Sequence, residues 1–205
     1  KSRFWMRQDL VVPHLVDYLT QRCGVRERDI TIVIANGTHT GGDEAELRTL
    51  VTDAVYDRIT VENHDCESED LVYLGTTPHG TPVSINRTAA LADMVICLGA
   101  ATHHVMAGFG GGRKSILPGI SGRETIFHNH AFSLDAAALR SNPAVGNGIL
   151  QGNPLHEDMC EAAGLVKNLF MVNLVMNTQM RLAAIFSGHY LTSWEQACRT
   201  VNRIY

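Results

Sequence analysis

The fold is indicated first by the stretch Asp29-Ile30-Thr31-Ile32-Val33-Ile34-Ala35, which runs directly into Asn36-Gly37-Thr38-His39-Thr40-Gly41-Gly42. The first half is rich in β-branched side chains, which favours a buried strand, and the second half is rich in turn-forming residues. A similar strand, Met94-Val95-Ile96-Cys97-Leu98-Gly99, precedes a second glycine-rich stretch. Apolar strands that end in glycine loops, with helical segments between them, predict an α/β fold with a mostly parallel sheet flanked by helices.

Further helices and strands are expected along the rest of the chain. Apolar spacing predicts a helix over residues 9–21, and Asp43 can cap another helix that runs to about residue 56. Residues 71–74 and 82–86 are typical of a hairpin. The other predicted elements are strands at 59–63 and 94–99, helices at 88–92, 123–132, 153–166 and 193–204, paired strands at 170–175 and 182–186, and a long loop at 141–152.

The composition limits the class of protein. A chain of 205 residues with 45% apolar content can bury the core of one fair-sized domain. The net charge of −4 argues against a nucleic-acid binder, and the apolar stretches are too short to span a membrane. Five widely spaced cysteines fit a reducing compartment. We therefore expect a soluble cytoplasmic domain without nucleic-acid or membrane partners, and its start at Lys1, with neither Met nor signal peptide, suggests a fragment.

Two loops beyond strand ends carry the candidate chemistry, because ligands of α/β sheets collect at the carboxyl ends of the strands. His39 lies in the first loop and His104 in the second, which continues as Ala107-Gly108-Phe109-Gly110-Gly111-Gly112-Arg113-Lys114-Ser115-Ile116-Leu117-Pro118-Gly119. Its glycines let the backbone approach a ligand closely, and backbone N–H groups beside Arg113 and Lys114 would attract an anion. Arg113 interrupts the P-loop spacing, so we expect an anion-binding loop of another kind.

The histidines add proton-transfer and metal chemistry. Two imidazoles on opposite sides of a substrate carbon can each remove or return a proton, as a racemase requires. A third imidazole is a good ligand for nickel, copper or zinc. His128 and His130 are two residues apart on one predicted helix, so at most one of them faces the site. The residues themselves predict an anion site, a candidate metal ligand and a histidine pair.

Together these motifs resemble the nickel-dependent lactate racemase family. The resemblance rests on Gly37-Thr38-His39 after a strand, His104 ahead of the long glycine block, and Asn129-His130, and it covers nearly the whole chain. It implies that residues 1–205 form a single N-terminal cofactor-binding domain, with the family's C-terminal domain absent from this fragment. It also implies a nickel-pincer nucleotide, a pyridinium mononucleotide with two thiocarboxyl arms, and maturation proteins that supply it.

The resemblance implies a role for each matching residue. Lys114 corresponds to the lysine that holds the pincer covalently, and His130 corresponds to the protein ligand of nickel. His39 and His104 correspond to the acid/base pair, of which one takes the hydroxyl proton of a 2-hydroxy acid while the α-hydrogen passes to the cofactor as hydride. Return of the hydride to the other face inverts the carbon. The remaining expected cofactor-binding residues are Arg3, Gly110, Gly111 and Gly112.

Departures from the family pattern leave the substrate and two other functions open. Gly110 stands where many members have serine, and Thr40 stands where arginine is common, so the particular 2-hydroxy acid is not assigned. One alternative is a module that cradles a phosphate or nucleotide without a covalent bond. Another is a zinc hydrolase that uses His39, His104 and His130, although the chain lacks a His-Glu-x-x-His motif. Structural roles are expected for His79, His103, His156, Cys160 and Trp194.

Overall fold

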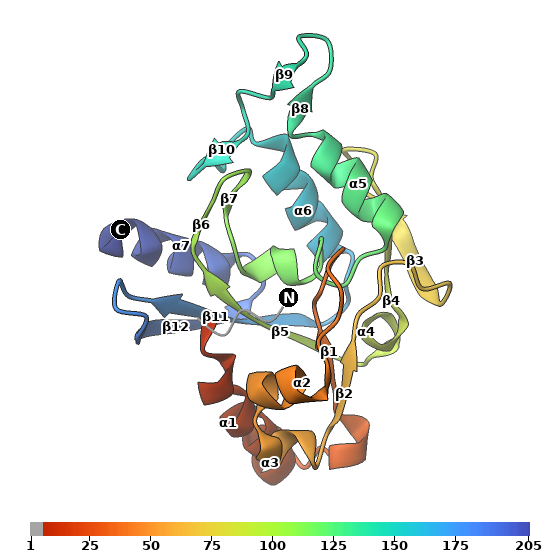
Figure 1. Cartoon of the computed structure of the whole chain (residues 1–205), viewed down its shortest axis with the longest axis vertical. Helices are drawn as coiled ribbons and strands as arrows, with labels where there is room; N and C mark the ends of the chain where they lie inside the picture. Colours follow the sequence, from red (N-terminus) through yellow and green to blue (C-terminus); the bar gives the residue numbers. More distant parts are fainter. Residues whose placement is uncertain (1–5) are drawn as a thin grey trace.

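The computed structural model describes residues 6–205 and has the predicted α/β architecture (Figure 1). Its central sheet has the strand order β12-β11-β5, from Leu182–His189, Leu169–Met176 and Val95–Ala101. β11 pairs in parallel with β5 and antiparallel with β12. Six consecutive residues of β11 are buried, as expected for a strand that is covered on both faces, whereas β12 alternates between half-buried and exposed residues.

Helix α7, Thr192–Ile204, packs on β11 and β12. Its buried side chains recur at helical spacing, which gives it one apolar face for the sheet. Trp194 is the largest of them and joins Phe109 and Val175 in one core cluster. The C-terminal helix therefore contacts both the central sheet and the glycine-rich segment that follows β5.

A separate parallel pair, β1 (Thr31–Ile34) and β2 (Thr60–Asn63), is connected through α2 (Glu44–Val51) and α3 (Asp53–Tyr56). These helices and α1, Val12–Asp17, lie together at the lower end of the molecule in Figure 1. Their apolar side chains form a cluster with those of β1. A π-helical turn at Tyr18–Arg22 extends α1, and short 3₁₀ helices lie at Gln8–Leu10 and Glu27–Asp29.

The helix predicted from Asp43 to residue 56 begins as expected but is not continuous. The Asp43 side chain accepts a hydrogen bond from the Glu46 backbone N–H and caps α2. Thr52 then adopts a positive φ of 77°, which ends α2 and starts α3. The prediction of one helix is wrong here, because nothing in the local sequence, neither glycine nor proline, marks the break.

The predicted hairpin forms from β3 (Leu71–Thr76) and β4 (Pro82–Asn86), and a short helix, α4 (Arg87–Leu91), follows it. Helices α5 (Arg123–Ala131) and α6 (Pro154–Gly164) pack against each other on this side of the molecule (Figure 1). Asn153 caps α6, with Pro154 in the first turn. These assignments confirm the helices predicted from residues 123 and 153.

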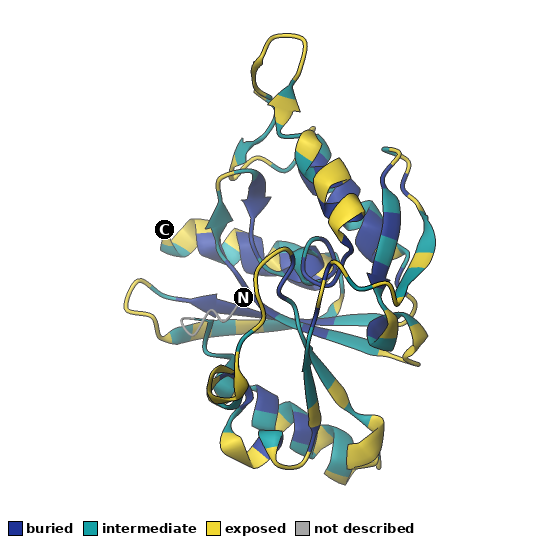
Figure 2. Cartoon of the chain, turned by 45° about the vertical axis from the view of Figure 1, so that its right-hand side comes forward, coloured by how far each residue is buried: buried dark blue, intermediate teal, exposed yellow. Residues whose placement is uncertain are grey.

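The glycine-rich segment after β5 is more ordered than a loop. It contains two short paired strands and a 3₁₀ helix, and residues 141–152, expected as a loop, contribute a third strand. A small hairpin projects from the body of the molecule, and Figure 2 shows that its tip is exposed. These elements are β6 (His103–His104), β7 (Ala107–Phe109), the 3₁₀ helix Gly112–Ser115, β8 (Leu134–Asp135), β9 (Arg140–Ser141) and β10 (Gly146–Asn147).

The parallel character of the sheet is confirmed only in part. The pairs β1–β2, β5–β11 and β7–β10 are parallel, whereas β3–β4, β6–β7, β8–β9 and β11–β12 are antiparallel. β1 and β5, expected at one sheet edge, belong to different sheets. Within residues 6–205, no helix is both long enough and apolar enough to cross a membrane.

Candidate functional site

The loop that carries His39 lies against the glycine-rich segment even though their strands are not paired. The Gly37 backbone N–H donates to the Gly119 carbonyl at 2.9 Å. Gly37 has a φ of 59°, and a Cβ there would lie 3.5 Å from the Pro118 carbonyl oxygen, so the two backbones are in close contact. Asn36, which is buried, anchors the loop to the end of β2 through a 3.0 Å bond to Asn63 Oδ1. His39 and the segment that contains Lys114 are thus brought together.

The glycines 110–112 pack the segment onto the rest of the protein. The Gly110 carbonyl accepts a 2.9 Å hydrogen bond from the Trp194 indole, and its N–H donates to Thr102. A Cβ on Gly111 would come within 2.6 Å of the Ala100 carbonyl oxygen, and one on Gly112 would overlap the Trp194 side chain. The close approach expected toward a ligand is here an approach to β5 and α7.

Arg113, which we expected to attract an anion, is instead buried inside the protein. Its side chain, 1% exposed, donates to the Phe109 carbonyl at 2.8 Å, the Ala107 carbonyl at 2.6 Å and His156 Nδ1 at 3.1 Å. Its guanidinium carbon lies 3.9 Å from the centroid of the Trp194 ring. Burial lowers the pKa of Arg113 to about 10. The expectation that Arg113 attracts an anion is wrong, because its donors are used inside the protein, and the phosphate-cradle alternative loses one of its two cations.

Lys114 occupies a different environment from its neighbour. It is half-buried in the 3₁₀ helix Gly112–Ser115, and its carbonyl accepts a hydrogen bond from Gly119. Burial lowers the pKa of His130, and the positive charge of Lys114 lowers it further. The sequence separates these two residues by a turn and a helix, and the fold places them within electrostatic reach of each other.

A hydrogen bond of His130 selects one tautomer of its neutral ring. Its Nδ1 lies 2.8 Å from the Ile126 carbonyl oxygen, so Nδ1 carries a hydrogen and the neutral ring has its lone pair on Nε2. An Nδ1–H bonded to a backbone carbonyl is the usual arrangement of a metal-binding imidazole. His128, two residues earlier, is exposed and bonded to Thr81. The two histidines therefore face different surroundings, as the helical spacing predicts.

His104 is held in the opposite tautomer. Its Nδ1 accepts hydrogen bonds from the backbone N–H groups of Met106 at 3.2 Å and Ala107 at 3.1 Å. A neutral ring in this position carries its hydrogen on Nε2. His103, its neighbour on the short strand, bonds Asn202 at 2.9 Å and stacks near Phe109, in the structural role expected for it.

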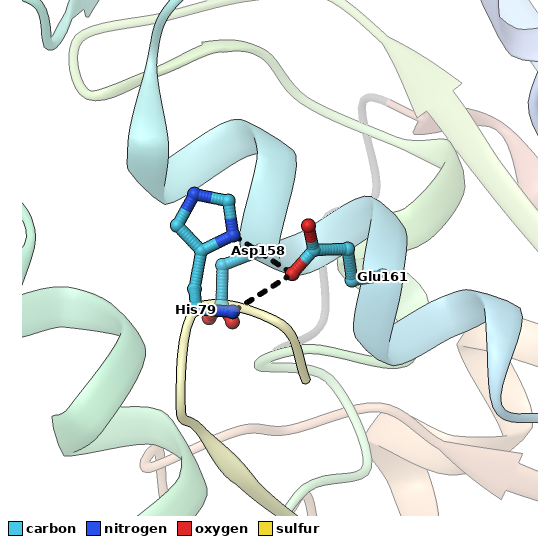
Figure 3. Close-up of side chains that lie close together, drawn as sticks. All are labelled: His79, Asp158 and Glu161. Atoms are coloured by element: carbon cyan, nitrogen blue, oxygen red, sulfur yellow. Dashed lines mark hydrogen bonds and ion pairs between the residues drawn. The ribbon is translucent and has the colours of Figure 1, made fainter. Parts of the chain in front are cut away.

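The ligand atoms of His39, His104 and His130 do not form a group close enough together to hold one metal ion. Residues 6–205 contain a single group of three or more ligand atoms within reach of one cation, and it consists of His79, Asp158 and Glu161 (Figure 3). The zinc hydrolase alternative required the three predicted histidines to form such a group. Arg3, the other expected cofactor-binding residue, lies outside the described residues.

The group in Figure 3 was not predicted from the sequence. His79 Nδ1 lies 2.8 Å from Glu161 Oε2, and this carboxylate raises the pKa of His79. Asp158 is fully buried and accepts hydrogen bonds from Thr77 and Thr81. The sequence did contain a sign of the buried carboxylate, because Asp158 lies on the apolar face of the helix predicted at residues 153–166. A carboxylate at such a position needs polar partners from other elements.

Comparisons with known proteins agree with the resemblance noted above. The family model of the lactate racemase N-terminal domain matches residues 2–141. A lactate racemase of Thermoanaerobacterium thermosaccharolyticum is 31% identical over 196 residues, which cover 95% of this chain and 44% of that protein. A lactate racemase of Lactiplantibacillus plantarum is 31% identical over 176 residues, covering 85% of this chain and 40% of that protein.

Solved structures show the same relationship. The lactate racemase apoprotein from T. thermosaccharolyticum matches with a TM-score of 0.89 and 30% identity, over 98% of this chain and 46% of that chain. A crystal structure from Thermotoga maritima matches with a TM-score of 0.81 at 22% identity, over 98% of this chain and 52% of that chain, which indicates a shared fold. The chain therefore spans about half the length of these proteins or less.

Proposed function

This chain belongs to the lactate racemase family, whose N-terminal domain it matches, and from that premise we propose that it is the cofactor-binding domain of a nickel-dependent 2-hydroxyacid racemase or epimerase. The proposal takes residues 1–205 as one domain, with substrate contacts also coming from a further domain, since the relatives are about twice as long. Its remaining partners are a small 2-hydroxy acid and the proteins that mature the cofactor.

The observation that carries the proposal is the state of His130 beside Lys114. Burial and the charge of Lys114 lower the pKa of His130, which favours the neutral imidazole, and in that form the lone pair is on Nε2. Neutral imidazole with the other nitrogen bonded to a carbonyl suits Ni(II). A half-buried lysine within electrostatic reach suits covalent attachment of a nucleotide. The residues present therefore fit a nickel-pincer nucleotide, held by Lys114 and ligated by His130.

The chain's own residues would divide the proton chemistry between two histidines. When bound, the cofactor supplies the hydride acceptor. His104, with Nδ1 occupied by backbone N–H groups, holds a proton at Nε2 and can donate a hydrogen bond to the substrate oxygen. His39, on the adjoining loop, is the group that takes the hydroxyl proton.

The function is tested with the complete protein, produced together with cofactor-maturation proteins. Each enantiomer of lactate, and then of larger 2-hydroxy acids, is incubated with enzyme and analysed by chiral chromatography. We expect the wild type to interconvert the enantiomers of at least one acid, and Lys114→Arg, which keeps the charge but cannot form the adduct, to be inactive. Unchanged racemisation in Lys114→Arg would show that covalent attachment has no part in the reaction.

A further inference from the structure

A buried carboxylate connects three elements behind the proposed nickel ligand. Asp158, on α6, is 0% exposed. Its Oδ1 accepts a 2.5 Å hydrogen bond from the Thr77 hydroxyl, and its Oδ2 accepts bonds from the Thr81 hydroxyl at 2.9 Å and Asn129 Nδ2 at 2.7 Å. The two threonines belong to the turn between β3 and β4, and Asn129 belongs to α5. Three donors stabilise a charge that would otherwise be costly to bury.

Ligand atoms of His79, Asp158 and Glu161 lie close enough together to surround a cation, but both Asp158 oxygens and Glu161 Oε2 already accept hydrogen bonds. Asp158 accepts three hydrogen bonds, and Glu161 accepts from both the ring and the backbone N–H of His79. Figure 3 shows the imidazole directed at Glu161. These three residues therefore form a hydrogen-bonded clamp, in which α6 holds the turn of the hairpin through the half-buried Glu161 and the fully buried Asp158.

Asp158, the fully buried residue of the clamp, also binds α5 through Asn129. Only three side chains of α5 are buried, and Ile126 is the one apolar residue among them. The others dock by hydrogen bonds: Thr125 donates to the Pro82 carbonyl at 2.7 Å, and Asn129 donates to Asp158 and to the Leu155 carbonyl at 3.1 Å. With so little apolar contact, the position of α5 depends on polar bonds that have fixed geometry.

Asn129 directly precedes His130. We propose that Asp158 is a positioning residue for the nickel ligand: by holding Asn129, it fixes the last turn of α5 and so the direction of the His130 imidazole. This inference rests on the proposed function, since it presumes that His130 binds nickel. Residues that orient a ligand from behind typically change metal affinity about 10- to 100-fold when they are substituted.

The test substitutes Asp158→Asn in the complete, matured protein and measures nickel release. The amide keeps the side-chain size but removes the negative charge and one acceptor oxygen, so the charge-assisted bond from Asn129 becomes weaker. We expect the Lys114 adduct to form, as seen by intact mass, and nickel to dissociate into a chelator about 10- to 100-fold faster, followed by absorption of the nickel centre.

Two control variants separate positioning from general instability. Glu161→Gln weakens the outer half of the clamp on the same helix, and Val16→Ala removes core packing at α1, in a different cluster. Both are expected to release nickel at the wild-type rate, whatever their melting temperatures. Faster nickel release in Val16→Ala would assign the Asp158→Asn effect to stability and overturn the inference.

A second variant decides the question if Asp158→Asn does not fold. Asn129→Ala leaves Asp158 with both threonines and removes only the connection to α5, so it should release nickel faster while the adduct stays in place. Nickel held as tightly as in the wild type would refute the positioning role. If instead the wild type carries neither adduct nor nickel, the proposed function itself fails, which is a different result.

Discussion

Arg113 and Lys114 are adjacent cations whose side chains end in opposite environments. Arg113 is buried against Trp194 and His156, whereas Lys114 is half-buried in reach of His130. The sequence predicts two cations in a glycine loop but cannot tell which one points inward. That choice depends on Trp194, 81 positions after Arg113, whose ring covers the guanidinium. The local sequence therefore offered both residues as candidates and misassigned the arginine, whose donors are used inside the protein.

We expect Arg113→Lys to lower the free energy of unfolding by roughly 2–4 kcal/mol, because an ammonium group cannot satisfy two carbonyls and an imidazole from one position. The three acceptors are Phe109, Ala107 and His156. Urea denaturation followed by circular dichroism measures the change. The matched control is Arg123→Lys at an exposed arginine, for which we expect less than about 0.5 kcal/mol. Equal effects at both positions would mean that the buried bonds contribute nothing specific.

Among the helices, the two capping residues Asn153 and Asp43 differ in the number of hydrogen bonds that they make to other elements. Asn153 caps α6 through the His156 N–H at 3.2 Å, and its Nδ2 donates to the carbonyls of Met106 and Ile149, each at 2.9 Å. Asn153 thus connects α6 to the glycine-rich segment at Met106 and to the loop at Ile149 that follows β10. Asp43 caps α2 through a single bond at the surface.

Substitution of these two caps by alanine tests that difference. Asp43→Ala should cost about 1 kcal/mol, the usual value for a cap, whereas Asn153→Ala should cost about 2–3 kcal/mol because it also removes two hydrogen bonds to backbone carbonyls. Chemical denaturation of both variants gives the comparison. If Asn153→Ala costs no more than Asp43→Ala, the bonds to Met106 and Ile149 do not stabilise the segment.

Local patterns predicted most elements, and tertiary pairing explains what they missed. The strand at 29–35, the hairpin at 71–86 and the helix capped by Asn153 follow from periodicity, turn residues and capping. The break at Thr52 and the division into several sheets do not, because strand partners and strained backbones are set by distant contacts. The candidate site follows the same rule. His39, Lys114 and His130 belong to motifs that can be recognised in the sequence, whereas the role proposed for Asp158 depends on its hydrogen bond to Asn129 of α5, which only the fold brings about.

For the molecule as a whole, buried histidines make stability depend on pH. Burial and the charge of Arg113 lower the pKa of His156 to about 3, and burial lowers the pKa of His64. The unfolded chain then binds more protons below pH about 6.5 than the folded chain does, so stability falls as pH drops from about 6.5 toward about 3. His79 has the opposite sign, since its raised pKa adds stability that is lost as pH rises, but it is partly exposed and contributes less.

We expect the unfolding free energy to be lower at pH 4.5 than at pH 7, with roughly 2–3 kcal/mol of the difference due to His156. The measurement is urea denaturation at both pH values. In His156→Gln the difference should shrink by about that amount, whereas His14→Gln, at an exposed histidine, should leave it unchanged. A wild-type difference that persists in full in His156→Gln would show that other groups control the acid sensitivity.

Intact mass combined with nickel analysis shows whether this domain carries a nickel-pincer nucleotide on Lys114, as we propose. The complete protein is produced with cofactor-maturation proteins, beside a lactate racemase relative that acquires its cofactor in the same preparation. We expect an adduct of about a few hundred daltons, localised to Lys114 by peptide mapping, with about one nickel per chain. Unmodified Lys114 and no nickel, in a preparation that loads the relative, would contradict this proposal.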